Sequence, residues 1–186
     1  MTKPIQLTYD HFDQAWDIIE SQDHYMTIPR EQIQDAAMWS KSFWLKFFED
    51  ADPNYRMYGT FLDDELVHIT TMHLWSVMPY ATSGGVMTKD TLTGKNFLRT
   101  TVQHNRYLMD TVMIEEGRKK AYWVSGHVSP RARKVMGGDK WLYCHEDQIP
   151  AGEVSKWRGF SLLTGTKTWP IDLNIHSFTW RGDDVK

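Results

Sequence analysis

The feature that most constrains the fold is a change of hydrophobic period near residue 89. Residues 55–88 read as three strands, because apolar and polar residues alternate there and turn-forming residues separate the runs. From Gly94 onward the apolar residues recur every three or four positions, which predicts a helix over 94–116. A strand is expected next, at 121–125. Because a long helix between two strands lets them run parallel in one sheet, this order predicts a parallel pair beside an antiparallel meander.

The other expected elements complete the order β-α-α-β-β-β-α-β-α-β-β, an α+β domain with a mixed, mostly antiparallel central sheet. The strands of the meander are expected at 55–62, 65–75 and 80–88. The remaining elements are a strand at 5–7, a helix capped by Asp10, helices at 31–49 and 130–136, and strands at 141–146 and 171–180. Gly84 and Gly85 within the third strand predict a β-bulge, or a place where a ligand approaches the backbone closely.

Composition narrows the class of protein. The 186 residues contain no linker-like run and no repeat, so we expect one domain over residues 1–186. The formal net charge of −3 gives no reason to expect nucleic acid or an anionic membrane as a partner. No apolar stretch reaches the roughly 20 residues that span a bilayer, and the first residues lack the apolar core of a secretory signal. A single cysteine, Cys144, suits a reducing compartment, so we expect a cytoplasmic protein.

The order of elements resembles that of the GNAT superfamily, the acyl-CoA-dependent N-acyltransferases. Two segments carry the resemblance, GGVMTKDTLTGKNFLRTTV at 84–102 and VSPRARKVMGGDKW at 128–141. In that family the strand of the first segment ends at a loop that cradles phosphate, and the following helix points its first amides at the coenzyme A pyrophosphate. The chain departs from the family pattern in two places. The loop 91–96 has only one glycine, and Met136 falls where the family often has the tyrosine that protonates the leaving thiolate.

The resemblance implies acetyl-CoA, or another acyl-CoA, as cosubstrate, with no metal. The first amides of a helix lack partners within the helix, and its dipole favours anions there, so the start of the 94–116 helix suits a phosphate. The edge of the strand at 86–88 could pair with the amide-bearing pantetheine arm by strand addition. The expected cosubstrate-binding residues are Val86, Met87, Thr88, Thr93, Gly94, Lys95, Asn96, Arg99, Arg131 and Arg133.

Three residues are candidates for proton transfer. His127 lies just past the end of the 121–125 strand, where the crevices of α/β sheets open and a histidine could take the proton of an amine. His73 is a second candidate base, and Tyr143 could replace the missing tyrosine as a proton donor. Both histidines also have a structural interpretation: His127 as a loop residue bonded to local backbone, and His73 as an ordinary residue of the sheet. His68 and His73 project from opposite faces of one strand, so they cannot share a metal ion.

Two functions therefore stay open. The first is an enzyme that transfers an acyl group from coenzyme A to an unidentified primary amine. The second is a binding module on the same fold that takes up a small ligand or a protein partner. Cys144 and His145 point to opposite faces of their strand, which favours a buried thiol over a nucleophile and base pair. The strand at 171–180 is expected to be exposed, so it could pair with a second subunit in a homodimer.

Overall fold

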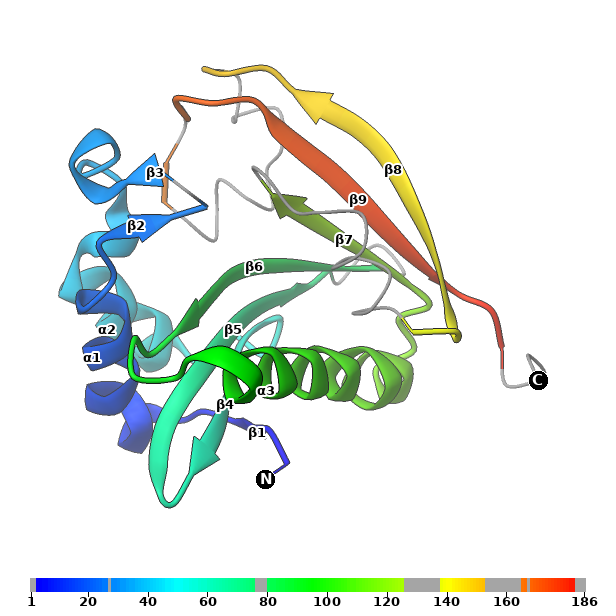
Figure 1. Cartoon of the computed structure of the whole chain (residues 1–186), viewed down its shortest axis with the longest axis horizontal. Coiled ribbons are helices and arrows are strands. Elements are labelled where there is room, and N and C mark those ends of the chain that lie inside the picture. Colours follow the sequence, from blue (N-terminus) through cyan, green and yellow to red (C-terminus); the bar gives the residue numbers. More distant parts are fainter. Residues whose placement is uncertain are drawn as a thin grey trace.

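The computed structural model of the chain describes residues 3–26, 28–75, 80–125, 138–152, 165–166 and 168–182, with the backbone alone for 80–86. Its centre is a seven-stranded sheet in the order β1-β4-β5-β6-β7-β9-β8 (Figure 1). Among the strands of the described residues, only β6 and β7 pair in parallel. The bounds are β1 Ile5–Gln6, β4 Tyr55–Leu62, β5 Glu65–Leu74, β6 Tyr80–Thr88, β7 Lys120–Ser125, β8 Trp141–Ile149 and β9 Leu173–Trp180. The mixed, mostly antiparallel sheet predicted from the sequence is confirmed.

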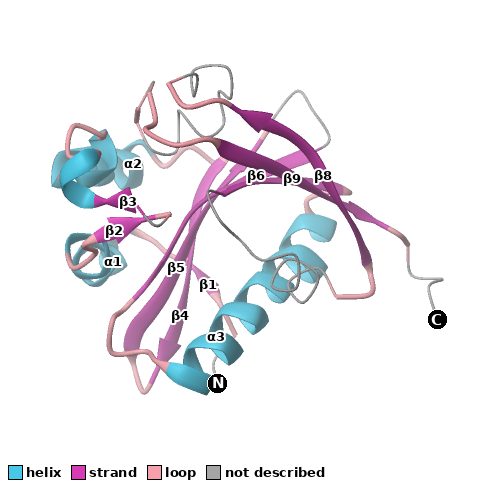
Figure 2. Ribbon diagram, turned by 45° about the horizontal axis from the view of Figure 1, so that its top comes forward, coloured by secondary structure: helices cyan, strands magenta, loops and turns pink. Residues whose placement is uncertain are grey.

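Helices cover both faces of this sheet (Figure 2). Helices α1 (Phe12–Glu20) and α2 (Lys41–Asp50) pack on one face, and α3 (Gly94–Tyr107) packs on the other. Beyond its last residue α3 continues as a π-helical stretch, Leu108–Met113. The predicted stop is confirmed at Gly117, whose φ of 69° is a left-handed conformation that favours glycine. A small hairpin, β2 (His24–Tyr25) and β3 (Ile28–Pro29), follows α1.

Two buried clusters hold the layers together, one on each face. The larger joins α1 and α2 to strands along the whole sheet, with Ile18 and Trp44 from the helices and Met57, Val124 and Ile175 from the strands. The smaller lies between the sheet and the π-helical stretch, and it includes Met109 and Phe178. Successive residues of a strand point to opposite faces, so they enter one cluster and the other in turn. The sequence of a strand that is covered on both faces is therefore a nearly continuous apolar run.

The structure corrects four details of the sequence prediction. Only the second half of the helix expected at 31–49 is an α-helix, namely α2. The first half forms two 3-10 turns, Arg30–Gln32 and Ala37–Trp39. Asp10 lies inside a further 3-10 turn, Tyr9–His11, whose N-cap is Thr8. Cys144 is exposed, because β8 is an edge strand. The strand expected at 171–180 is β9, which lies between β7 and β8 and therefore offers no free edge for the expected dimer. The short helix expected at 130–136 lies outside the described residues.

Candidate functional site

The strands β6 and β7 part in the middle of the sheet. They pair from Tyr80 with Lys120 as far as Ser83 with Trp123. Beyond that point β6 continues to Thr88 on its ladder with β5, and β7 continues to Ser125 on its ladder with β9. Figure 1 shows the arrowheads of the two strands pointing apart. In the described part of the sheet, each strand therefore has an edge that faces the gap and pairs with no strand there.

A β-bulge lies where the gap begins. In the ladder between β5 and β6, Met72 pairs with Ser83 and Thr70 pairs with Val86, so Gly84 and Gly85 together lie opposite one residue of β5. This confirms the bulge predicted from the two glycines. A bulge bends its strand and strengthens the local twist. It therefore gives a local reason for β6 to turn away from β7 at this position.

The first turn of α3 is open to solvent close to the end of β6. Thr93 is its N-cap in an extended conformation and makes no side-chain capping bond. Gly94 has a φ of 61°, and a Cβ built on it would meet no atom within 4 Å. Lys95, Asn96 and Arg99 are exposed, and the first turn carries no acidic residue. The helix thus presents uncapped amides beside two cations, which is the electrostatic arrangement that favours an anion.

The loop after α1 closes against the end of β6. Gln22 donates a hydrogen bond from Nε2 to the Thr88 carbonyl oxygen at 3.1 Å. A depression of about 340 Å³ lies here, and it is lined by residues of this loop together with Thr88, Phe97 and Thr101. Lys89, which precedes the loop to α3, forms an ion pair with Glu65. The end of β6 and the start of α3, two parts of the predicted cosubstrate site, are therefore neighbours on one surface.

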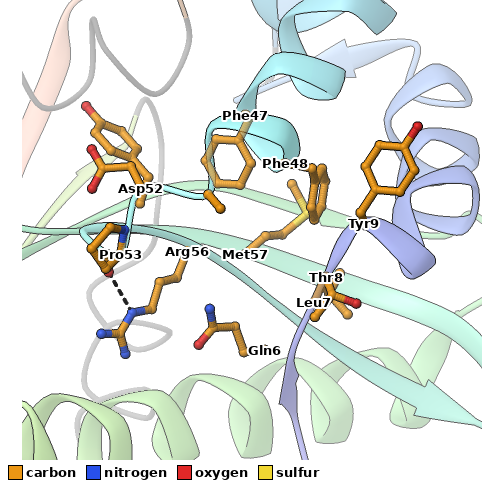
Figure 3. A pocket seen from close by; sticks show the side chains of 12 residues that line it. Gln6, Leu7, Thr8, Tyr9, Phe47, Phe48, Asp52, Pro53, Arg56 and Met57 are labelled. Carbon is orange, nitrogen blue, oxygen red and sulfur yellow. Dashed lines mark hydrogen bonds between the residues drawn. The ribbon is translucent and has the colours of Figure 1, made fainter.

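A second hollow, of about 210 Å³, lies away from the parted strands. It is formed by β1, the end of α2 and the start of β4 (Figure 3). Arg56 is one of its lining residues and donates from Nε to the Pro53 carbonyl oxygen at 2.8 Å. None of the residues predicted to bind the cosubstrate or to transfer a proton lines this hollow. It therefore has no part in the site described here.

The predicted proton-transfer residues do not come together. His73 is buried on the face covered by α2, where its ring stacks on Tyr55 with centroids 4.3 Å apart. Tyr55 in turn contacts Phe47 of α2. Tyr143 belongs to the cluster on the α3 face, so the sheet separates its side chain from His73. His127, Arg131 and Arg133 lie outside the described residues.

Two polar residues that the sequence did not single out form a hydrogen-bonded chain with Tyr143. Its hydroxyl lies 3.1 Å from Nδ1 of His176, and Nε2 of the same ring lies 2.8 Å from the Ser125 hydroxyl. Both His176 and Ser125 are buried. The three residues come from β8, β9 and β7, and 33 and 51 positions separate the bonded partners in the sequence. No local pattern could have found them. Only the pairing of β9 between β7 and β8 brings them together.

A buried pair of histidines lies under α3, next to the end of β6. His68 of β5 bonds through Nδ1 to the Thr88 hydroxyl at 2.7 Å, and its ring contacts the ring of His104 with centroids 4.5 Å apart. Burial lowers the pKa of His68 to about 4. Burial, followed by the charge of His68, lowers the pKa of His104 well below its usual value. Both rings are therefore neutral near pH 7.

No group of three or more His, Cys, Asp or Glu side chains in the described ranges could hold a metal ion. None of the helices within those ranges is long and apolar enough to cross a membrane.

Several solved acetyltransferase structures superpose on nearly the whole chain, although no family model and no curated protein matches the sequence. A probable acetyltransferase from Staphylococcus epidermidis superposes with a TM-score of 0.68 at 12% identity, over 96% of this chain and 99% of its own. The PaiA N-acetyltransferase from Thermoplasma acidophilum, solved in complex with coenzyme A, gives 0.61 at 12% identity, over 97% and 100%. The ribosomal-protein-S18-alanine N-acetyltransferase from Escherichia coli gives 0.61 at 13% identity, over 100% and 99%. The chain therefore has the fold of the GNAT N-acetyltransferases.

Proposed function

We propose that this protein transfers an acyl group, most simply acetyl, from coenzyme A to a primary amine. The observation that carries the proposal is the gap between β6 and β7 beside the open first turn of α3. The edge of β6 at 86–88, which pairs with no described strand on the side of the gap, suits the amides of pantetheine, which would add to the sheet as a short strand. The distance along the chain from this edge to Gly94 is short, so one extended cosubstrate can contact both places.

The phosphates of the cosubstrate would lie at the start of α3. Thr93, Gly94, Lys95 and Asn96 offer backbone amides there, and the helix dipole adds to their effect. Lys95 and Arg99 supply positive charge from exposed side chains. Arg131 and Arg133 would contact the nucleotide end, because a guanidinium suits phosphate. The exposed Gly94 leaves room for a phosphate to approach the backbone.

The amine would attack the thioester carbonyl directly. Backbone amides near Met87 would stabilise the oxyanion as it forms, and a base would take a proton from the amine nitrogen. His127 is our first candidate for this base and His73 the second. Holding the two reactants together contributes more to the rate than one proton donor or acceptor does. Loss of one of these residues would therefore slow the reaction without abolishing it.

Binding of acetyl-CoA tests the proposal. At a concentration 100 times its dissociation constant, a ligand of the folded state raises the free energy of unfolding by about 2.7 kcal/mol, which a thermal shift measures readily. We expect Gly94→Trp to abolish the shift, because the indole would occupy the place of the phosphate. Gly117→Trp is the matched control, since Gly117 ends the same helical segment, also has a positive φ and also has open space around it. Acetyl-CoA should still shift the melting temperature of this control.

The outcomes separate the two functions that the sequence left open. Absence of a shift at millimolar acetyl-CoA would refute the proposal. A shift that Gly94→Trp leaves intact would mean that the cosubstrate binds elsewhere. Binding without transfer to any amine, including small amines such as hydroxylamine, would favour a binding module on the same fold.

A further inference from the structure

Ser125, His176 and Tyr143 form a hydrogen-bonded relay across three neighbouring strands, which we call the Ser125 relay. Its bonds measure 2.8 Å from Ser125 Oγ to His176 Nε2 and 3.1 Å from His176 Nδ1 to Tyr143 Oη. Each ring nitrogen of His176 thus has one member of the relay as its neighbour. An imidazole in this position can take a proton at one nitrogen while it gives a proton from the other.

The relay ends at the gap between β6 and β7. Ser125 is the last residue of β7 and lies two positions beyond Trp123, the last residue that pairs with β6. At a rise of about 3.3 Å per residue, its Cα lies about 7 Å along the strand from the point where the gap begins. The bulge of Gly84 and Gly85 lies across the gap from this strand end.

The relay lies on the same face of the sheet as α3. The Tyr143 ring contacts Phe178 with centroids 5.5 Å apart, and Phe178 belongs to the cluster under the π-helical stretch that follows α3. A cosubstrate whose phosphates lie at the start of α3 approaches the gap from this face. Ser125 and His176 are 9% and 2% exposed, so their polar groups are held in place by the bonds that compensate their burial.

On the basis of the proposed function, we infer that the Ser125 hydroxyl protonates the sulfur of coenzyme A as it leaves. When the tetrahedral intermediate collapses, the carbon–sulfur bond breaks and its electron pair stays on sulfur. Ser125 gives its proton to that sulfur and takes one from His176 Nε2. His176 Nδ1 in turn takes the hydroxyl proton of Tyr143, and solvent returns a proton to the phenolate. The amine loses its own proton to the separate base, so atoms and charges balance.

Tyrosine at the far end is what makes the relay effective. An aliphatic alcohol alone is far too weak an acid to protonate a thiolate. Free phenols titrate near pH 10 and free thiols near pH 8.5, so a proton passed from a phenol to a thiolate moves between groups of similar acidity. Because the transfer moves the negative charge from sulfur to the phenol, Ser125 never has to carry it. The relay would thus supply the proton donor that Met136 lacks.

Comparison of coenzyme A with desulfo-coenzyme A tests the contact to sulfur without any need for turnover. The wild-type protein should bind coenzyme A about 3- to 10-fold more tightly than the desulfo compound, as measured by calorimetry, which is the range expected for one hydrogen bond. Ser125→Ala should bind the two compounds equally, whereas Tyr143→Phe, which keeps the ring, should retain the preference. Equal binding of both compounds by the wild type would overturn the inference and leave the proposed function intact. Failure to bind either compound would overturn both.

The transfer step tests the rest of the relay. With acetyl-CoA and hydroxylamine, Ser125→Ala and Tyr143→Phe should each lower kcat about 10- to 100-fold, with little change in the KM of acetyl-CoA. Because the two residues act in one chain, the double variant should lose no more than either single variant. Multiplicative losses, or a Tyr143→Phe variant as fast as the wild type, would refute the relay.

Discussion

The buried histidine pair should make the stability of this protein fall steeply in weak acid. In the unfolded chain a histidine takes up its proton near pH 6.5, whereas burial delays this in the folded protein until about pH 4 for His68. Between these two values the unfolded state binds more protons, so the free energy of unfolding falls as the pH falls. His104 acts in the same direction, because its pKa is lowered as well.

The size of the effect follows from the shift of His68 alone. Lowering the pKa of His68 from about 6.5 to about 4 corresponds to about 3 kcal/mol in full, of which about 2 kcal/mol falls between pH 7 and pH 4.5. Carboxylates add their own contribution over this range, so the wild-type curve by itself cannot isolate the pair. A variant that removes one titrating ring can isolate it.

We therefore propose to compare His68→Gln with the wild type by urea unfolding at pH 7 and pH 4.5. Glutamine keeps a polar group near the Thr88 hydroxyl but does not titrate. The variant should be less stable than the wild type at pH 7, and it should lose about 2 kcal/mol less on acidification. His24→Gln, which removes an exposed histidine, is the matched control and should follow the wild-type curve. A His68→Gln variant that loses as much as the wild type would refute the reasoning.

Two core substitutions test the packing that supports the site. Gly59→Ala should destabilise the protein by about 1–3 kcal/mol in urea unfolding, because the new Cβ would lie 2.5 Å from Leu66 Cδ1 and 2.8 Å from Leu7 Cδ2, both in buried side chains. A neutral result would mean that β1 can move away from β4 without cost. Trp44→Phe should cost about 1–3 kcal/mol, since it leaves a cavity and removes the 2.7 Å bond from the buried indole to the Met38 carbonyl oxygen. The same loss in Trp39→Phe, whose indole makes no described hydrogen bond, would show that packing alone accounts for it.

The parts of the fold that the sequence predicted well depend on local patterns. The three strands of the meander and the helix that begins at Gly94 were expected within a residue or two of where they lie, because each has a clear period and a turn at its end. The helix expected at 31–49 was wrong in its first half. Ile33 and Ala36 have helical spacing, but a spacing of three also fits successive 3-10 turns. In the structure the chain forms these turns, and both residues are buried in the larger cluster.

The candidate site also has one part that local sequence predicted and one part that it did not. Apart from Arg131 and Arg133, its predicted cosubstrate half is one continuous segment, 86–99, so the order of elements was enough to propose it. The Ser125 relay depends on β9 lying between β7 and β8, and nothing in 141–180 specifies that order locally. The exposed thiol of Cys144 follows from the same fact, because it depends on β8 being the edge strand.

The insertion of β9 also has a consequence for biosynthesis. A ribosome makes β7 and β8 before β9, yet neither of them bonds to the other, and both pair with β9. Until Leu173–Trp180 has emerged, β7 has an open edge and β8 has no place in the sheet. In a nascent chain paused before that segment, the unpaired backbone groups of β7 could pair with a neighbouring chain. A chaperone that shields β7 would be most useful at that moment.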